Sequence, residues 1–164
     1  MRKSLIITRA AISAAAAMAA VALVTSPAGA TSASAQWRIP GGDTWEVNAW
    51  HCTTYWDVCD WTASAKLLGN TPPNAIWINN RTELEAHGFD VSIEIAKEPK
   101  ATLTMKSDSL GEVTWTNNNA WIADNSGTMD PSWSTTYVST RSCGSGQVTP
   151  DILVSEKCVY AGAF

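Results

Sequence analysis

The stretch that decides the fold is FDVSIEI, residues 89–95, in which apolar and polar residues alternate. A period of two places every apolar side chain on one face of a β-strand, whereas a helix would distribute the same residues around its axis. The stretch ATLTM, residues 101–105, repeats this alternation after a short polar segment, residues 97–100. The two stretches therefore predict an antiparallel hairpin with one buried face and one solvated face.

Short segments of strand-forming residues continue on both sides of this predicted hairpin. They span residues 44–51, 60–68, 75–79, 110–116, 120–123, 133–140 and 152–160. Clusters of Gly, Pro, Asn and Ser that favour turns lie between them, at residues 40–42, 69–73, 117–119, 125–127 and 144–146. This spacing predicts an all-β protein, a small antiparallel β-sandwich formed by a single domain over residues 36–164.

One segment, NRTELEAHG at residues 80–88, also fits a short helix near 81–87, because it has a capping residue at its start and Gly just past its end. The alternative is a strand or an irregular connection. In either case Glu83 and His87 share a face. Together with Glu85 they could bind a metal ion, or act as a base and the group that orients it. A capped, solvated helix end would account for the same residues without any site.

The N-terminal residues have the three parts of a secretory signal peptide. Basic residues come first, and residues 10–24 form an apolar stretch of 15 residues, shorter than the roughly 20 that a transmembrane helix needs. Small residues then precede two possible cleavage points, after Ala30 and alternatively after Ala35. We expect residues 1–30 to be removed, so that the mature protein is secreted and extracellular and keeps no stable membrane anchor.

All four cysteines, Cys52, Cys59, Cys143 and Cys158, follow the predicted signal peptide. An even number of cysteines in an exported chain indicates structural disulfides, and three pairings are formally possible. The short separations favour two local disulfides, Cys52–Cys59 and Cys143–Cys158. A zinc site is the alternative, but the spacings match no C-x-x-C pair and the chain has only two histidines. The sequence therefore predicts neither a metal ion nor a cofactor.

A calcium loop is a weaker alternative for one later segment. Oxygen-bearing side chains recur at every second residue there, namely at Asp124, Ser126, Thr128 and Asp130. The segment lacks the density of carboxylates and the closing Glu of a known calcium loop.

The charge of the chain argues against nucleic acid as a partner. Without residues 1–35, 8 Lys and Arg remain beside 15 Asp and Glu, a net charge of about −7. The basic residues are scattered, and an acidic surface repels the phosphate backbone whose neutralisation supplies most non-specific affinity. We therefore expect the charge to serve solubility.

Aromatic residues gather around the first two cysteines in WHCTTYWDVCDW, residues 50–61. Tyr55 and Trp56 fall inside the loop, which has little depth in which to bury two large rings. If the two cysteines pair directly across a hairpin, Trp50 and Trp61 lie on one face beside the disulfide, where they can support the loop. These four rings form the predicted binding face, and rings that merely cover the end of the core are the alternative.

Three classes of function remain. The prediction is a secreted, non-enzymatic binding module for a carbohydrate or cell-envelope polymer, because flat rings stack on sugars and Asn- and Thr-rich turns can bond to hydroxyl groups. One alternative is a secreted inhibitor or other module that contacts an extracellular protein. Another is a small secreted hydrolase. Its active site would need Glu83, Glu85, His87 or the scattered acids Asp57 and Asp60 to converge. No G-x-S-x-G motif occurs, and no catalytic residue is predicted.

Overall fold

The chain folds into ten β-strands in the computed structural model, which describes residues 31–53, 57–69 and 74–162. The strands are β1 (Ser32–Arg38), β2 (Thr44–His51), β3 (Cys59–Leu68), β4 (Ala75–Gly88), β5 (Ile93–Lys97), β6 (Thr102–Ser107), β7 (Leu110–Ala120), β8 (Ile122–Pro131), β9 (Thr135–Thr149) and β10 (Ile152–Gly162). Within these residues the structure contains no helix that is long and apolar enough to cross a membrane.

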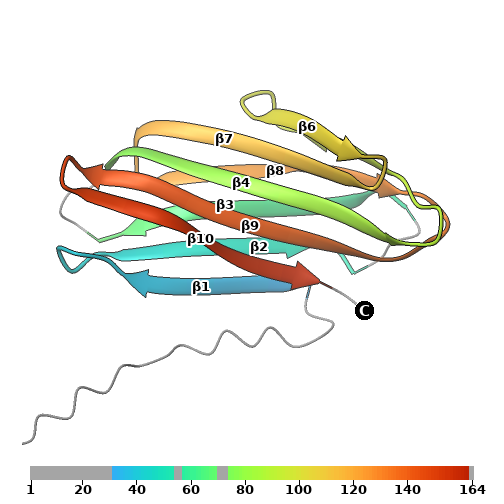
Figure 1. The fold of residues 1–164 in the computed structure, drawn as a ribbon, viewed down its shortest axis with the longest axis horizontal. Helices are drawn as coiled ribbons and strands as arrows, with labels where there is room; N and C mark the ends of the chain where they lie inside the picture. Colours follow the sequence, from blue (N-terminus) through green and yellow to red (C-terminus); the bar gives the residue numbers. More distant parts are fainter. Residues whose placement is uncertain (1–30, 54–56, 70–73, 163–164) are drawn as a thin grey trace, which may run out of the picture.

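The strands form two antiparallel sheets of five strands each. Sheet A has the order β1-β2-β3-β8-β5, and sheet B has the order β10-β9-β4-β7-β6. Figure 1 shows the two sheets stacked with their long strands running nearly side by side, which confirms the predicted β-sandwich. Both sheets turn one face toward the shared core and the other toward solvent.

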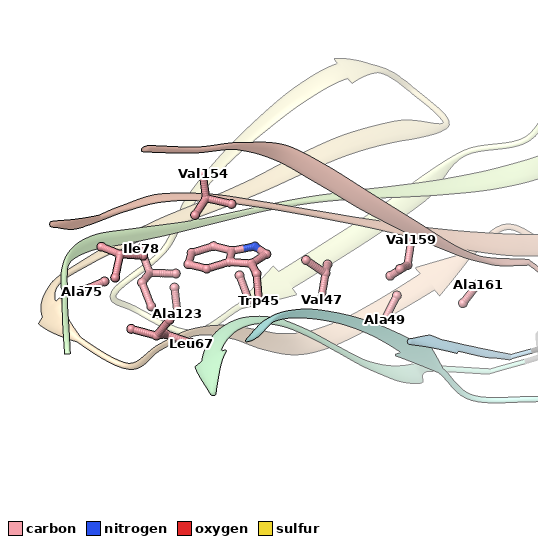
Figure 2. Packing of buried hydrophobic residues seen from close by; sticks show 12 residues of the cluster. Trp45, Val47, Ala49, Leu67, Ala75, Ile78, Ala123, Val154, Val159 and Ala161 are labelled. Carbon is pink, nitrogen blue, oxygen red and sulfur yellow. The ribbon is translucent and has the colours of Figure 1, made fainter. Parts of the chain in front are cut away.

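The period of two along β2 and β3 builds one half of the core. Trp45, Val47 and Ala49 point inward from β2 and are buried, while the residues between them lie on the outer face. Figure 2 shows the Trp45 ring between the two sheets, with Ile78 and Val154 packed near it. A fully buried Trp is among the largest single contributions to such a core, about 3 to 5 kcal/mol against its truncation to Ala.

A buried polar layer divides this cluster from a second apolar cluster around Leu84 and Met129. On β4, Asn80 and Thr82 lie between Ile78 of the first cluster and Leu84 of the second, and both polar residues are fully buried. Their side chains bond to each other, since Thr82 Oγ1 donates to Asn80 Oδ1 at 2.8 Å. These two buried side chains therefore find a hydrogen-bond partner within the core, as most buried polar groups do.

The predicted short helix near 81–87 is wrong, and the strand alternative is correct. Residues 75–88 form β4, the central strand of sheet B, which pairs with β9 on one side and β7 on the other. Leu84 and Ala86 fill the core while Glu85 between them faces outward. Two neighbouring strands offer a full set of backbone partners, which outweighs a local signal for helix termini.

The hairpin predicted from residues 89–95 and 101–105 is also wrong, although both segments contribute a strand. β5 pairs with β8 in sheet A, and β6 pairs with β7 in sheet B. Residues 98–101 therefore connect the two sheets, and Ala101 is buried at the connection. Alternation identifies a strand and its apolar face, but it does not identify the neighbouring strand.

Three predicted turns lie within strands. Residues 117–119 belong to β7, residues 125–127 to β8 and residues 144–146 to β9. The glycines of β9 serve packing, because a Cβ on Gly146 would stand 2.6 Å from the Trp45 ring and one on Gly144 would stand 2.6 Å from Ala65. Gly in a strand interior often marks such a close approach.

Both predicted disulfides, Cys52–Cys59 and Cys143–Cys158, are present. The first closes the loop between β2 and β3, and the second joins neighbouring residues of β9 and β10. Two disulfides are consistent with an extracellular location.

Candidate binding surfaces

The four aromatic residues of the predicted binding face do not lie together on one described surface. Tyr55 and Trp56 lie outside the described residues. Trp50 is 40% exposed on the outer face of sheet A, whereas Trp61 is fully buried in the core. Trp61 can therefore support a surface from within, but its ring does not reach a ligand.

The register of β2 and β3 explains this separation. The expectation that Trp50 and Trp61 share a face required the two cysteines to stand directly opposite each other, and it is wrong. Trp61 instead pairs with His51, and Trp50 pairs with Thr62. A shift of one residue moves a side chain to the other face of a strand, so Trp61 joins the core side.

A shallow groove of about 570 Å³ runs across the outer face of sheet A beside Trp50. We call it the Trp50 groove. Its hydroxyl and amide lining comes from Ser32, Ser34, Asn48, Thr62, Ser64 and Ser126. The strands place these side chains on one face because they occupy alternate positions along β1, β2, β3 and β8.

A second hollow, of about 390 Å³, adjoins the Trp50 groove. Trp50, Thr62 and Ser126 line both, so the indole stands where the two hollows meet. The second hollow adds the carboxylate of Asp60 and the hydroxyl of Thr128. The outer face thus offers one partly exposed ring flanked by groups that donate and accept hydrogen bonds.

Charged side chains border the groove and are held by neighbours. Asn48 Nδ2 donates to Glu46 Oε1 at 2.9 Å, and this bond is the main reason that the pKa of Glu46 lies below its usual value. Lys66 Nζ lies 3.4 Å from the same carboxylate oxygen. At the other side Lys100 pairs with Asp124 at 3.1 Å. The groove therefore contains balanced charges rather than a field of one sign.

Glu83, Glu85 and His87 do lie on one face, the outer face of sheet B, but other partners hold them. Burial raises the pKa of Glu83, and the Lys106 hydrogen bond together with the charges of Arg81 and Arg141 outweighs this effect and lowers it. The Arg81 and Lys106 nitrogens stand 2.6 and 3.2 Å from Glu83 Oε1. An acid in such an ion-pair network is poorly suited to bind a metal ion.

His87 lies in a setting that superficially resembles a hydrolase site. Its Nε2 is hydrogen-bonded to Ser139 Oγ at 2.9 Å and stands 3.6 Å from Glu85 Oε2, while its ring stacks on Tyr137. Serine and acid approach the same ring nitrogen, whereas a base and its orienter need opposite nitrogens. Ser139 is also buried, so a substrate would not reach its hydroxyl.

The weak calcium alternative does not fit the strand geometry. Asp124, Ser126, Thr128 and Asp130 alternate along β8, whose straight run spreads them over roughly 20 Å. Among the described residues, the one group that brings three possible ligand atoms together is Cys143, Glu156 and Cys158, and its two cysteines form a disulfide.

A further surface was missed by the sequence reasoning. Phe89 and Trp133 are 89% and 90% exposed, and they line a hollow of about 570 Å³ together with Asp90, Ser92, Ser132 and Ser134. We call it the Phe89–Trp133 pocket. Alternation placed Phe89 on a buried face, but β5 begins only at Ile93, and the residues before it form a loop. Asp90 next to Phe89, an acid that tolerates tight turns, was the available signal.

Comparison with protein-family models finds no match, and comparison with curated proteins finds none. Among solved structures, the chain is similar to a collagen-binding domain from a Staphylococcus aureus adhesin. The similarity has a TM-score of 0.38 and 7% sequence identity, and it covers 83% of this chain and 98% of that chain. At this level it carries no argument about function, which therefore rests on the surfaces themselves.

Proposed function

We propose that this protein is a secreted, non-enzymatic binding module that holds a polysaccharide or another cell-envelope polymer along the outer face of sheet A. The observation that carries the proposal is the position of Trp50 between two adjoining hollows lined by small hydroxyl and amide side chains. An extended polymer could occupy both hollows and pass over the ring.

The chemistry of the lining suits sugars. A sugar ring has an apolar C–H face that packs on an indole, and a rim of hydroxyl groups that both donate and accept hydrogen bonds. Ser and Thr hydroxyls also act in both roles, so they can match hydroxyls in several orientations. Because the lining side chains project from paired strands, the ordering cost is met on folding and not on binding.

The test is retention of the mature protein on insoluble chitin, cellulose and peptidoglycan. Trp50→Ala should weaken binding by about tenfold, the equivalent of about 1.4 kcal/mol. Trp121→Ala is the matched control, because Trp121 is 49% exposed and lies between β7 and β8, beside Leu67 at the opposite end of β3. Equal losses in the two variants, or unchanged binding in Trp50→Ala, would exclude the groove as the site.

A second candidate is contact with an extracellular protein through the disulfide loop between β2 and β3. The observation that favours it is Val58, which is 56% exposed directly beside buried Cys59. An exposed apolar residue on a loop closed by a disulfide is a common form of protein contact. Val58→Asp should abolish retention on immobilised secreted proteases and leave polymer binding unchanged if this candidate is correct.

A further inference from the structure

Two aromatic rings stand almost fully in solvent at one end of the sandwich, outside the Trp50 groove. Phe89 follows β4 and Trp133 follows β8, and both border the Phe89–Trp133 pocket. Gly88 pairs with Thr135 and Ile93 pairs with Pro131, so the two loops are neighbours in space. Exposed aromatic surface of this kind often marks a site of binding.

Hydrogen bonds fix the two loops to each other. Ser132 N donates to the Ser92 carbonyl at 2.9 Å, and Ser132 Oγ accepts from Ser92 N at 3.1 Å. Ser134 Oγ donates to the carbonyl of Asp90 at 3.1 Å. Asp90 has a φ of 54°, a left-handed conformation that this bond helps to hold. The backbone that carries the rings is therefore ordered before any ligand arrives.

The charge at this end has one sign. The described connecting residues 57–58, 88–92, 107–109 and 132–134 contain Asp57, Asp90 and Asp108 and no Lys or Arg. The third segment meets the second, since Ile93 N donates to the Asp108 carbonyl at 2.9 Å. No ion pair joins Asp90 to a basic side chain within the described ranges. The carboxylate in the pocket thus attracts cations without a counter-ion from the described chain.

We propose that the Phe89–Trp133 pocket binds an organic ammonium group. The faces of Phe and Trp rings carry negative charge density that attracts an ammonium ion, and apolar substituents on nitrogen pack on the same rings. Asp90 adds a full negative charge at the pocket wall. A hollow of about 570 Å³ has room for a substituted ammonium group.

The alternative occupants differ in charge. A neutral sugar would use the rings but gain nothing from the carboxylate, and an anionic membrane surface would be repelled by the three aspartates. The site is independent of the proposed polymer binding, because Trp50 is not among the residues that line this pocket. The two proposals can therefore fail separately.

The experiment titrates the mature protein with choline chloride, with butylammonium chloride, and with the neutral isostere of choline in which a tert-butyl group replaces trimethylammonium. The indole N–H resonance of Trp133, assigned by its loss in Trp133→Phe, reports binding by NMR. At least one cation should bind about fivefold or more tightly than the isostere. The tighter cation indicates whether the natural source carries a quaternary ammonium group or a lysine-like amine.

Variants complete the test. Asp90→Asn should weaken binding of the cation about fivefold and leave the isostere unaffected, and Asn is tolerated in the left-handed conformation of this position. Phe89→Ala should weaken binding, whereas Trp50→Ala should not. Equal affinity for cation and isostere, no shift of the Trp133 resonance with either cation, or unchanged binding in Asp90→Asn would overturn the proposal.

Discussion

Asn125 Nδ2, on sheet A, donates to both the backbone carbonyl and the side-chain Oδ1 of Asn80, on sheet B, at 3.1 and 2.9 Å. Both residues are buried, and Asn80 Nδ2 in turn donates to Ser142 Oγ at 2.8 Å. The two sheets are thus joined by directional bonds at the level where the two apolar clusters separate. Such bonds fix how one sheet lies on the other, which apolar contacts alone specify less strictly.

Asn80→Ala should destabilise the domain by about 3 kcal/mol, because it leaves Asn125, Thr82 and Ser142 without a shared partner in the core. Asn48→Ala is the control, since it removes the same side chain from the partly buried outer face and should cost about 1 kcal/mol or less. Urea unfolding of both variants measures the difference. If Asn80→Ala costs no more than the control, the buried polar layer contributes little to the free energy of unfolding.

Gly146→Ala should cost about 2 kcal/mol, because the new methyl group would collide with the Trp45 ring and with the backbone carbonyl of Trp77. Ser145→Ala, at the neighbouring position of β9, is the matched control and should be nearly neutral. Combining Gly146→Ala with Trp45→Phe should recover part of the loss, since the smaller ring frees space. Simple additivity of the two costs would contradict the proposed contact.

Trp61→Ala should lower the free energy of unfolding by about 3 kcal/mol or more, because the ring is fully buried. Trp50→Ala and Trp56→Ala should change stability little, and Trp56→Ala should reduce binding if its ring belongs to the binding face. Thermal unfolding and polymer retention measured on the same samples separate these effects. Severe melting of the Trp56→Ala variant would place that ring in the core.

Removal of Cys143–Cys158 should cost more than removal of Cys52–Cys59, since the sequence separations are 15 and 7. Closure entropy gives about 3 and about 2.4 kcal/mol for the two loops. Paired Cys→Ala variants and denaturant unfolding test this order. The reverse order would indicate that the stabilisation by Cys52–Cys59 comes mainly from native contacts and not from the closure entropy of the unfolded chain.

Stability should fall as the pH drops from 7 toward 5. Burial lowers the pKa of His51 from its usual value of 6.5, and hydrogen bonds to the backbone of Cys52 and Ala161 oppose this shift only in part. Below about pH 6.5 the unfolded chain binds a proton that the folded chain excludes, so the folded state loses stability. His51→Gln should flatten this dependence. An unchanged slope in His51→Gln would exclude His51 as its source.

The mature N-terminus should be Thr31, and mass spectrometry of exported material determines it. Cleavage after Ala30 leaves β1 complete, whereas cleavage after Ala35 would remove Ser32 to Ala35, which pair with β2 opposite Trp50 to Val47. Ser32 and Ser34 also line the Trp50 groove. A product that begins at Gln36 would contradict cleavage after Ala30 and would leave the mature protein without this part of the groove wall.

The sequence by itself determined the all-β class, the bounds of β2, nearly the bounds of β3 and β10, and both disulfides. These properties are local, because alternation depends on neighbours two residues apart and a short cystine loop depends on few residues. The same reasoning included Trp50 in the predicted binding face. It placed Trp61 beside Trp50 only because it assumed a register.

The tertiary structure alone decided the sheet partners, the register and the surfaces. β5 and β6 follow one another in the chain yet lie in different sheets, because residues 98–101 cross from sheet A to sheet B between them. In the sequence, the glycines of β9 are typical of a turn. In the structure they lie within a strand, where Gly146 leaves the space that the Trp45 ring of β2 occupies. Phe89 and Trp133 are 44 residues apart in sequence and meet only because β4 and β9 pair at that end. Such contacts depend on how distant strands are brought together, which no local pattern of residues encodes.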